Sequence, residues 1–285
     1  DGCNNRCTFC ITTIARGESR SRPIEEIITD IHASYPAQEI VLTGVHLGSW
    51  GQDLSPRLSI QHLVEQVLER TNTPRLRLSS LEPWDLDKLF FELWQNPRLC
   101  RQLHLPLQSG CERTLRRMAR KTTPQAFAEL LQAARQAIPG VAITTDIITG
   151  FPGEDEQEFE ESLEFVRQMQ FADGHVFTYS ARAGTAAARM PGQVTQPIRK
   201  HRNARMREAL AESTLAYQTG FLGQTLSVLW ESATSLGPQG WELSGLTGNY
   251  LRVFARSTQQ LWNQVTPVVL EQLDEHGLHG RILED

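Results

Sequence analysis

Residues 142–169, AITTDIITGFPGEDEQEFEESLEFVRQM, contain a predicted strand, a turn and a predicted helix in direct succession. The first part, Ala142–Thr149, is rich in β-branched residues, which favour a strand. Three consecutive acidic residues then stand at the start of a predicted helix, Asp155–Met169, where the helix dipole favours negative charge. A second predicted strand, Gly174–Ser180, follows. Together these elements predict a βαβ unit with parallel strands.

The same alternation of strand and helix continues on the N-terminal side of this unit. The further predicted strands are Glu39–Gly44, Arg75–Ser79 and Gln102–Leu107, and the further predicted helices are Pro23–Ser34, Leu58–Arg70, Asp85–Gln95, Glu112–Ala119 and Pro124–Ala137. Alternation at this spacing predicts an α/β fold with a parallel sheet, as a barrel or part of one. Such folds place their chemistry on the loops that follow the carboxyl ends of the strands.

The pattern changes near residue 195. A long predicted helix, Pro197–Thr219, is followed from Phe221 by short alternating segments that are separated by glycine-containing turns. This pattern predicts a small all-β barrel. We therefore divide the chain into an α/β core over residues 1–195, a helical linker over 196–220 and a β-barrel over 221–285.

The composition excludes several classes of protein. The chain has 285 residues, of which 40% are hydrophobic and 21% charged, unlike a disordered or fibrous protein. Its formal net charge of -5 gives no overall positive field, so contact with nucleic acid requires a local patch. No apolar run reaches the length of about 18 residues that a membrane span requires. The chain opens on Asp1-Gly2-Cys3 instead of a secretory leader, and we expect it to be part of a longer protein.

Three of the 5 cysteines, Cys3, Cys7 and Cys10, form the pattern C-x-x-x-C-x-x-C. The other two, Cys100 and Cys111, are isolated and are predicted to be small buried apolar residues. Zinc sites prefer four ligands, and thioredoxin-type motifs contain one C-x-x-C. An iron–sulfur cluster is normally held by four thiolates, so three would leave one iron open to a substrate or cofactor. The triplet favours such an open iron–sulfur site, with zinc or a chance arrangement as the alternatives.

Motifs occur along nearly the whole chain. They are DGCNNRCTFC at Asp1–Cys10, RGESRSRP at Arg16–Pro23, EIVLTGVHLGSWG at Glu39–Gly51, LRLSSLEP at Leu76–Pro83, LHLPLQSG at Leu103–Gly110, TDIITGFPGE at Thr145–Glu154, HVFTYSARAGTAA at His175–Ala187 and MPGQV at Met190–Val194. In these motifs the chain resembles the radical S-adenosylmethionine (SAM) methylthiotransferases. The resemblance implies a partial parallel (β/α)6 barrel of radical SAM type, followed by a small TRAM-like RNA-binding β-barrel.

The resemblance also implies the cofactors. Cys3, Cys7 and Cys10 match the residues that bind a 4Fe-4S cluster in the superfamily, with SAM on the fourth iron. One-electron cleavage of SAM gives a 5′-deoxyadenosyl radical, which removes hydrogen from an unactivated aromatic carbon, while the protein binds and orients the reactants. The family carries a second 4Fe-4S cluster in an N-terminal domain, which we expect upstream of Asp1. Residues 1–285 alone are therefore expected to be incomplete for methylthiolation.

The wording LTGVHLG, SSLEP and HLPLQSG resembles one branch of the family. That branch adds a methylthio group to carbon 2 of N6-threonylcarbamoyladenosine at position 37 of tRNA. The alternatives are isopentenyladenosine in tRNA, a ribosomal protein, or an RNA-binding fragment without activity. The expected partners are the tRNA anticodon loop and a one-electron reductant, with no membrane, and the expected location is the cytoplasm.

Several residues are candidates for contact with SAM, and of these Thr43 and Gly44 match the position that contacts the methionine amino group of SAM in the superfamily. The candidates are Phe9, Thr43, Gly44, Gln108, Ser109, Asp146, Gly150 and Phe151, with Glu82 as a further one. For each, a plain structural role in a turn or a strand end is the alternative.

A basic stretch, residues 182–207, contains no acidic residue. Its candidate phosphate-binding residues are Arg182, Arg199, Lys200, Arg202 and Arg205. Trp241 and Tyr250 are candidates for stacking on unpaired bases. The alternative is a solvated helix face with aromatic residues in a core.

Overall fold

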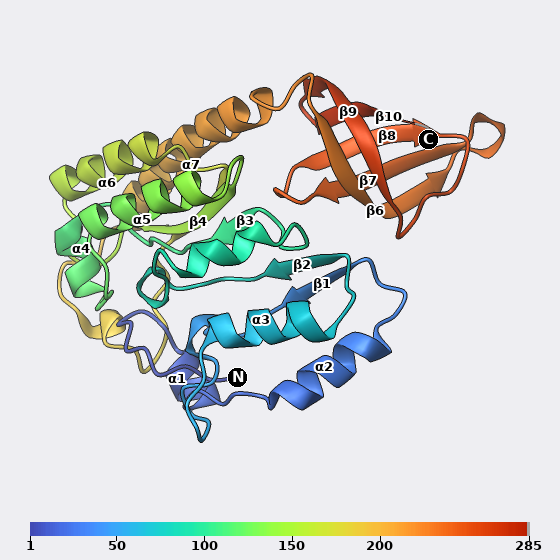
Figure 1. Ribbon diagram of the computed structural model, residues 1–285. Helices are drawn as coiled ribbons and strands as arrows, with labels where there is room; N and C mark the ends of the chain where they lie inside the picture. The colour runs from blue at the N-terminus through green and yellow to red at the C-terminus, as the bar shows by residue number, and fades with distance from the viewer. Residues whose placement is uncertain (284–285) are drawn as a thin grey trace.

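The computed structural model describes residues 1–283 (Figure 1). Within them, the N-terminal part is built on five parallel strands: β1 (Glu39–Leu42), β2 (Arg75–Leu78), β3 (Gln102–His104), β4 (Ala142–Thr149) and β5 (Asp173–Thr178). β1 pairs with β2, and β3, β4 and β5 form a second parallel sheet. Parallel bridges from Leu76 to Leu99 and from Ser80 to His104 join the two sheets. The predicted α/β fold with parallel strands is confirmed.

Helices cover the outer face of these strands. They include α2 (Ile24–Ala33), α3 (Ile60–Arg70), α5 (Pro124–Ala137), α6 (Glu156–Met169) and α7 (Gln196–Thr219). The other short elements are α1 (Thr12–Arg16), α4 (Glu112–Arg117) and the 3-10 turns η1 (Leu47–Ser49), η4 (Ala187–Arg189) and η5 (Gly237–Gln239), the last of which belongs to the C-terminal part. In Figure 1, α3 lies beside β1 and β2, and α5, α6 and α7 lie on the side of β4. The side chains of Ser59, Thr123 and Asp155 accept hydrogen bonds from the first turns of α3, α5 and α6, which fixes where these helices begin.

The largest apolar core of this part fills the space between helices and strands. Val64 of α3, Leu103 of β3, Ile147 of β4 and Leu163 of α6 are fully buried in it. Burial of each such side chain contributes about 1.5–3 kcal/mol. The core therefore fixes the strand ends, and with them the loops that carry the polar groups described below.

One predicted helix, Asp85–Gln95, is wrong. The segment forms two 3-10 turns, η2 (Pro83–Asp85) and η3 (Phe90–Gln95), with Leu86 extended between them. The side chain of Asp85 contacts His46 at 2.5 Å, and Asp87 Oδ1 accepts a hydrogen bond from Phe90 N at 2.9 Å. These side-chain contacts fix local turns, which compete with a continuous helix.

The C-terminal part is a closed five-stranded barrel, as predicted. Its strands are β6 (Thr225–Ser235), β7 (Trp241–Thr247), β8 (Arg252–Ser257), β9 (Val265–Asp274) and β10 (Gly277–Ile282), in the order β10-β8-β7-β6-β9. Trp230 is fully buried at its centre and donates its indole N–H to Thr266 at 2.8 Å. Closure leaves this small sheet without free edges.

The small barrel contacts the amino-terminal ends of the parallel strands. Arg75, the first residue of β2, donates to the carbonyl oxygen of Leu246 at 3.0 Å. Tyr217 near the end of α7 donates to the carbonyl oxygen of Gly140, just before β4, at 3.0 Å. The barrel therefore sits at the end of the sheet opposite to the loops that follow the strands (Figure 1).

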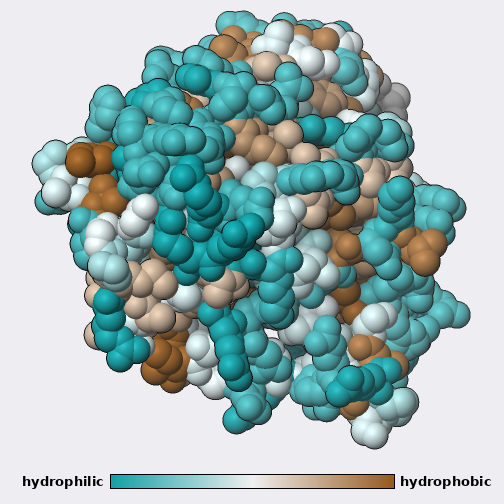
Figure 2. All heavy atoms as spheres, turned by 90° about the vertical axis from the view of Figure 1, so that its left-hand side faces the viewer, coloured by the Kyte–Doolittle hydropathy of each residue, from teal (hydrophilic) through white to brown (hydrophobic). Residues whose placement is uncertain are grey.

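The surface toward α4, α5 and α6 is mostly hydrophilic, with small separate hydrophobic spots (Figure 2). Among residues 1–283, no helix has both the length and the apolar character needed to cross a bilayer.

Candidate functional site

The loop with the three cysteines lies at the carboxyl ends of the parallel strands. Thr8 N donates to the carbonyl oxygen of Met118 at 3.0 Å, after α4, and Ala187 N donates to the carbonyl oxygen of Thr8 at 2.9 Å, after β5. Cys3 N donates to Gly17 O at 3.1 Å. These bonds fix the loop where chemistry in parallel α/β folds is expected.

The three thiols are free and partly exposed. Backbone N–H groups of Asn5 and Thr12 lie 3.4 Å from the sulfurs of Cys3 and Cys10. Burial raises the pKa of the Cys7 thiol, and the guanidinium of Arg120 acts in the opposite direction. Burial also raises the pKa of Cys3. A bound metal enforces the thiolate form, and the N–H donors then stabilise it.

The donor set suits an iron–sulfur cluster, because cysteine thiolates are the usual ligands of such clusters. Within residues 1–283, no three His, Cys, Asp or Glu side chains converge as the ligands of one ion do. In a 4Fe-4S cluster each thiolate binds a different iron, so the thiolates surround the cluster and need not meet at one point. Three free thiols on one short loop, with backbone N–H groups on the sulfurs of Cys3 and Cys10, are consistent with that arrangement.

Phe9 and Phe151, both predicted to lie near SAM, are in contact. Their ring centroids are 6.5 Å apart and their planes nearly perpendicular. Phe151 also packs on Tyr179, with ring centroids 5.3 Å apart, and is fully buried. Its side chain therefore supports Phe9 and the cysteine loop from the buried side. The buried hydroxyl of Tyr179 has no hydrogen-bond partner among the described residues.

Thr43 and Gly44 follow β1 and are exposed. They line a groove of about 390 Å³ that also includes Asp1 and Gly2, at the start of the cysteine loop, and Val41, an exposed residue of β1. The structure thus brings the end of β1 and the cysteine loop to the same groove.

Gln108 and Ser109 follow β3 and are both buried. Ser109 Oγ lies 3.4 Å from Ser162 Oγ of α6 and accepts a hydrogen bond from Cys111 N at 3.2 Å. Gln108 has a φ of 74° and joins the strands through bonds to Asp146 O and from Ile148 N. Ser109 therefore has a structural role in the loop, and Gln108 gives the loop its turn.

Asp146 of β4 has an unsatisfied acceptor. Its Oδ2 lies 3.4 Å from His104 Nε2 of the neighbouring strand. Its Oδ1 is buried with no hydrogen-bond partner among the described residues. A buried acceptor without a donor is costly, so this atom is suited to receive a hydrogen bond from a ligand.

Gly150 follows β4 with a φ of +70°, and a Cβ there would lie 2.1 Å from Arg199 Cγ. Gly150 N donates to Glu154 Oε1 at 2.9 Å. Burial raises the pKa of Glu154, against the opposing effects of Gly150 N–H and Arg202. Gly150 therefore allows α7 to pack closely on the loop after β4.

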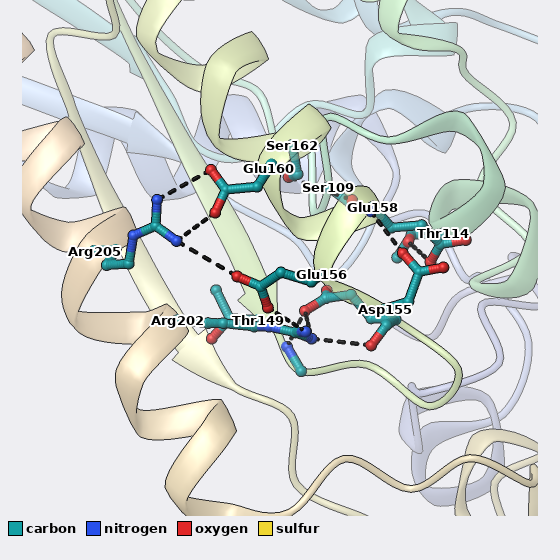
Figure 3. A network of polar contacts seen from close by, with 12 residues as sticks. Ser109, Thr114, Thr149, Asp155, Glu156, Glu158, Glu160, Ser162, Arg202 and Arg205 are labelled. Carbon is teal, nitrogen blue, oxygen red and sulfur yellow. Dashed lines mark hydrogen bonds and ion pairs between the residues drawn. The ribbon is translucent and has the colours of Figure 1, made fainter.

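Two arginines of the basic stretch are paired with acids and are not free for phosphate. Arg202 is buried and contacts Glu154 and Glu156 at 2.9 Å each. Arg205 pairs with Glu160 of α6. Figure 3 shows Arg202 and Arg205 reaching from α7 toward Glu156 and Glu160 of α6. The sequence stretch contains no acid, but the neighbouring helix supplies them.

The remaining basic candidates differ in exposure. Arg182 and Lys200 are exposed, whereas Arg199 is half-buried and donates to the carbonyl oxygen of Tyr179. Of the two aromatic candidates in the small barrel, Trp241 packs against the barrel core, and Tyr250 lies on Arg77 of β2 while remaining 45% exposed.

Two contacts at the cysteine loop were not predicted. His46 Nε2, in the loop after β1, lies 2.5 Å from Asp85 Oδ2, and His46 Nδ1 lies 3.5 Å from Asn5 of the cysteine loop. Arg120 Nη1 lies 3.9 Å from Cys7 Sγ, and the same guanidinium binds Glu82. His46 and Glu82 lie within the motifs, but Arg120 follows α4, and no sequence signal places it against Cys7.

Comparisons with known proteins agree with this site. The model of the family "Radical SAM superfamily" matches residues 1–166. The chain is 35% identical to threonylcarbamoyladenosine tRNA methylthiotransferase MtaB of Bacillus subtilis, with 100% of this chain and 64% of that protein covered. It is 34% identical to tRNA-2-methylthio-N(6)-dimethylallyladenosine synthase of Caldicellulosiruptor saccharolyticus, with 99% and 60% covered. The chain thus spans less than two thirds of the length of both relatives.

Solved structures share the fold at low identity. The radical S-adenosylmethionine methyltransferase TsrM of Kitasatospora setae matches with a TM-score of 0.55 and 14% identity, over 66% of this chain and 37% of that one. Methylornithine synthase PylB matches with a TM-score of 0.50 and 18% identity, over 73% and 60%. At these identities the likeness concerns the fold alone.

Proposed function

The chain belongs to the radical SAM superfamily, and on that basis we propose that it forms the SAM-cleaving core of a tRNA methylthiotransferase. The observation that carries the proposal is the loop of Cys3, Cys7 and Cys10, fixed at the carboxyl ends of the parallel strands and free of disulfides. Similarity over the whole chain to two tRNA methylthiotransferases supports the reaction class. We also propose the division into a core (1–195), a linker (196–220) and an RNA-binding barrel (221–285).

Cys3, Cys7 and Cys10 would hold a 4Fe-4S cluster. When bound, the cluster supplies the electron that cleaves SAM and so permits removal of hydrogen from an unactivated carbon. The chain's own residues bind and orient. The N–H groups of Asn5 and Thr12 stabilise two of the thiolates, and the packing of Phe9 on Phe151 keeps the loop in place.

The polar groups around the loop would position SAM. Asp146 Oδ1, buried without a donor, would accept a hydrogen bond from it. Thr43 and Gly44 line the groove beside Gly2 and would present exposed backbone and hydroxyl groups. Gly150 and Gln108 shape the neighbouring loops through their positive φ angles.

The proposed substrate is adenosine 37 of tRNA that carries the threonylcarbamoyl group. The wording LTGVHLG, residues 42–48, supports this choice. Overall sequence identity does not distinguish the two tRNA substrates, since it is 35% to the threonylcarbamoyladenosine enzyme and 34% to the dimethylallyladenosine enzyme. We further propose that Arg182, on the loop after β5, and Lys200, near the start of α7, contact tRNA phosphates because both are exposed.

The partners follow from this chemistry. A one-electron donor must reduce the cluster, and a second 4Fe-4S cluster, proposed for an N-terminal domain, would take part in sulfur transfer. The anticodon loop would enter at the carboxyl ends of the strands. Arg182 supports this placement, since the nearby Gly184 lies against Ile14 of α1, just after the cysteine loop.

The first experiment reconstitutes the chain with iron and sulfide without oxygen and then adds dithionite and SAM. We expect about four irons per chain and formation of 5′-deoxyadenosine. Cys7→Ala should lose both, whereas Cys111→Ala, which removes a buried thiol outside the loop, should keep both. A folded wild-type chain that binds no iron would contradict the enzyme and leave an RNA-binding module.

A second set of reactions separates the substrates. The reconstituted protein is incubated with tRNA that carries threonylcarbamoyladenosine, isopentenyladenosine or unmodified adenosine at position 37. We expect tRNA with threonylcarbamoyladenosine to bind most tightly and to increase the rate of 5′-deoxyadenosine formation most. Preference for the isopentenyl tRNA would assign the chain to the other substrate and leave the radical SAM core intact.

A further inference from the structure

Arg120 is buried among three loops at the carboxyl ends of the strands. Its side chain is only 2% exposed, and it follows α4 directly after Ala119, whose φ of 55° turns the chain inward. Nη1 and Nη2 donate to the two carboxylate oxygens of Glu82 at 3.1 and 2.7 Å. Nη2 also donates to the carbonyl oxygen of Pro106. The guanidinium is therefore held in one orientation.

The same guanidinium faces the cysteine loop. Nη1 lies 3.9 Å from Cys7 Sγ, a long contact of the kind that sulfur permits. Its Cζ lies 4.5 Å from the ring centroid of Trp84, which covers its other side. The Nε of Arg120 has no hydrogen-bond partner among the described residues. A single arginine thus joins the loops after β2 and β3 to the middle cysteine.

The local charges are unequal. Arg120 pairs with one carboxylate, that of Glu82. Lys121 Nζ lies 5.7 Å from the centroid of the Trp84 ring, the same ring that packs on Arg120. Two cations and one anion therefore stand beside the cysteines. Charge and hydrogen bonds at cluster sulfurs set the reduction potential of iron–sulfur proteins. Reduction adds one negative charge, so a buried cation nearby favours the reduced form and a buried anion disfavours it.

We propose that Arg120 is a positioning residue that orients Cys7 and raises the reduction potential of the cluster, while Glu82 holds Arg120 and opposes its charge. The inference rests on the function proposed above. The step it affects is the transfer of one electron from a low-potential donor, dithionite in the test, to the oxidised cluster. No bond forms or breaks in that step. The cluster gains one electron, and the donor is oxidised because it loses that electron.

The test is a redox titration of the reconstituted cluster without SAM, followed by electron paramagnetic resonance. The variants are Arg120→Met, Arg120→Lys and Glu82→Gln. The control is Arg116→Met, which removes a 75% exposed arginine at the end of α4 whose ion-pair partner among residues 1–283 is Glu112. Iron and sulfide per chain and circular dichroism check that each protein is loaded and folded.

We expect the reduction potential of the cluster to shift in opposite directions when Arg120 and Glu82 are replaced. At the potential where half of the wild-type cluster is reduced, Arg120→Met should lower the ratio of reduced to oxidised cluster at least threefold. Arg120→Lys should lower it less because it keeps the charge but loses the planar fork. Glu82→Gln should raise the ratio, and Arg116→Met should leave it unchanged.

Equal potentials in loaded wild type, Arg120→Met and Glu82→Gln would overturn the inference, as would shifts of Arg120→Met and Glu82→Gln in the same direction. If Arg120→Met does not retain a cluster, Arg120→Lys and Glu82→Gln test the inference. The reduction potentials of both variants must then shift in the stated directions. Failure of the wild-type chain itself to bind iron would instead overturn the proposed function, so the two failures are distinguishable.

Discussion

The guanidinium of Arg77 lies over the ring of Tyr250, with Cζ 5.1 Å from the ring centroid. Arg77 belongs to β2 of the parallel sheet and Tyr250 to the turn before β8, so the contact joins the core to the small barrel. The guanidinium also donates to the carbonyl oxygens of Thr247 and Gly248 at 3.2 and 3.3 Å. On the core side it binds both carboxylate oxygens of Glu39 at 2.7 and 3.1 Å.

Arg75 completes this junction, which consists of Glu39, Arg75 and Arg77. Arg75 Nε lies 2.8 Å from Glu39 Oε2, and its Nη1 donates to Leu246 O. All three side chains are at most 11% exposed. Salt screens buried pairs of this kind much less than surface pairs. The junction therefore fixes the barrel at the end of the sheet that lies away from the cysteines.

Arg77→Met should loosen the barrel from the core. The variant removes three interactions with the barrel and leaves Arg75 as the one cation paired with Glu39 among the described residues, at a cost of about 2–3 kcal/mol. Limited proteolysis of the connection after α7 should become at least tenfold faster. Arg252→Met breaks a pair with Glu231 that is about 42% exposed on the barrel, and it should change the rate less than threefold. Equal rates in both variants would show that the junction does not hold the barrel.

The junction should also weaken in acid. Burial alone would raise the pKa of Glu39, but the hydrogen bond and charge of Arg77, together with Arg75, outweigh it and hold the pKa below its ordinary value. The unfolded chain then binds more protons than the folded one in this range. The contribution of Glu39 to stability is complete above about pH 4.3 and is lost as the pH falls through the lower folded value.

Thermal unfolding between pH 3 and pH 7 (roughly the range of carboxylate titration) measures this effect. In Glu39→Gln the melting temperature should be lower at neutral pH and should fall less steeply in acid than in wild type. Glu271→Gln, which changes an exposed carboxylate of the barrel paired with Arg281, serves as the control and should follow the wild-type curve. A Glu39→Gln curve parallel to wild type would show that Glu39 does not carry the acid sensitivity.

Much of the fold can be predicted from the sequence because each signal is local. The strand Ala142–Thr149 and the helix Pro124–Ala137 have the predicted bounds, since β-branched residues fill the strand and Thr123-Pro124 begins the helix. The segment 85–95 is different. Its turns depend on the contact of Asp85 with His46, which comes from a loop far away in the sequence.

The candidate site likewise has features that are local in the sequence and features that are not. The cysteine spacing is a local signal, and it places three thiols on one loop. The charges around them are not local. Arg202 reads as a free cation in the sequence, but Glu154 and Glu156 approach it only after α6 packs beside α7. Arg120 lies in no motif and meets Cys7 only when the segment after α4 packs against the cysteine loop and the loops after β2 and β3. Tertiary packing therefore decides which charges are available, and the sequence alone does not show it.

The difference between exposed basic residues and those paired with acids predicts which of them affect tRNA binding. Lys200→Met and Arg182→Met should each weaken tRNA binding and reduce the slope of log affinity against log salt by about 0.7–0.9, since each removes one exposed cation that we propose to contact a phosphate. Arg205→Met should leave the slope within experimental error because Glu160 already neutralises its charge. Filter binding at several salt concentrations measures the slopes. A larger change for Arg205→Met than for Lys200→Met would contradict the assignment.

Gly150→Ala should destabilise the core through a specific contact with α7. At a φ of +70° any side chain is strained, and the new Cβ would lie 2.1 Å from Arg199 Cγ. Arg199 cannot easily move because its Nη1 is bound to the carbonyl oxygen of Tyr179. Strain of about 1 kcal/mol and overpacking of about 1–3 kcal/mol together predict a loss of about 3 kcal/mol in the free energy of unfolding, measured with urea.

Gly223→Ala is the matched control for this prediction. Gly223 has a similar φ of +80°, but nothing lies within 4 Å of the position of its Cβ. It should therefore lose only the strain of about 1 kcal/mol. In the background of Arg199→Ala, the cost of Gly150→Ala should fall toward that of Gly223→Ala, because the clashing Cγ is gone. An undiminished cost in that background would place the origin of the effect in the backbone of the loop after β4 and not in its contact with α7.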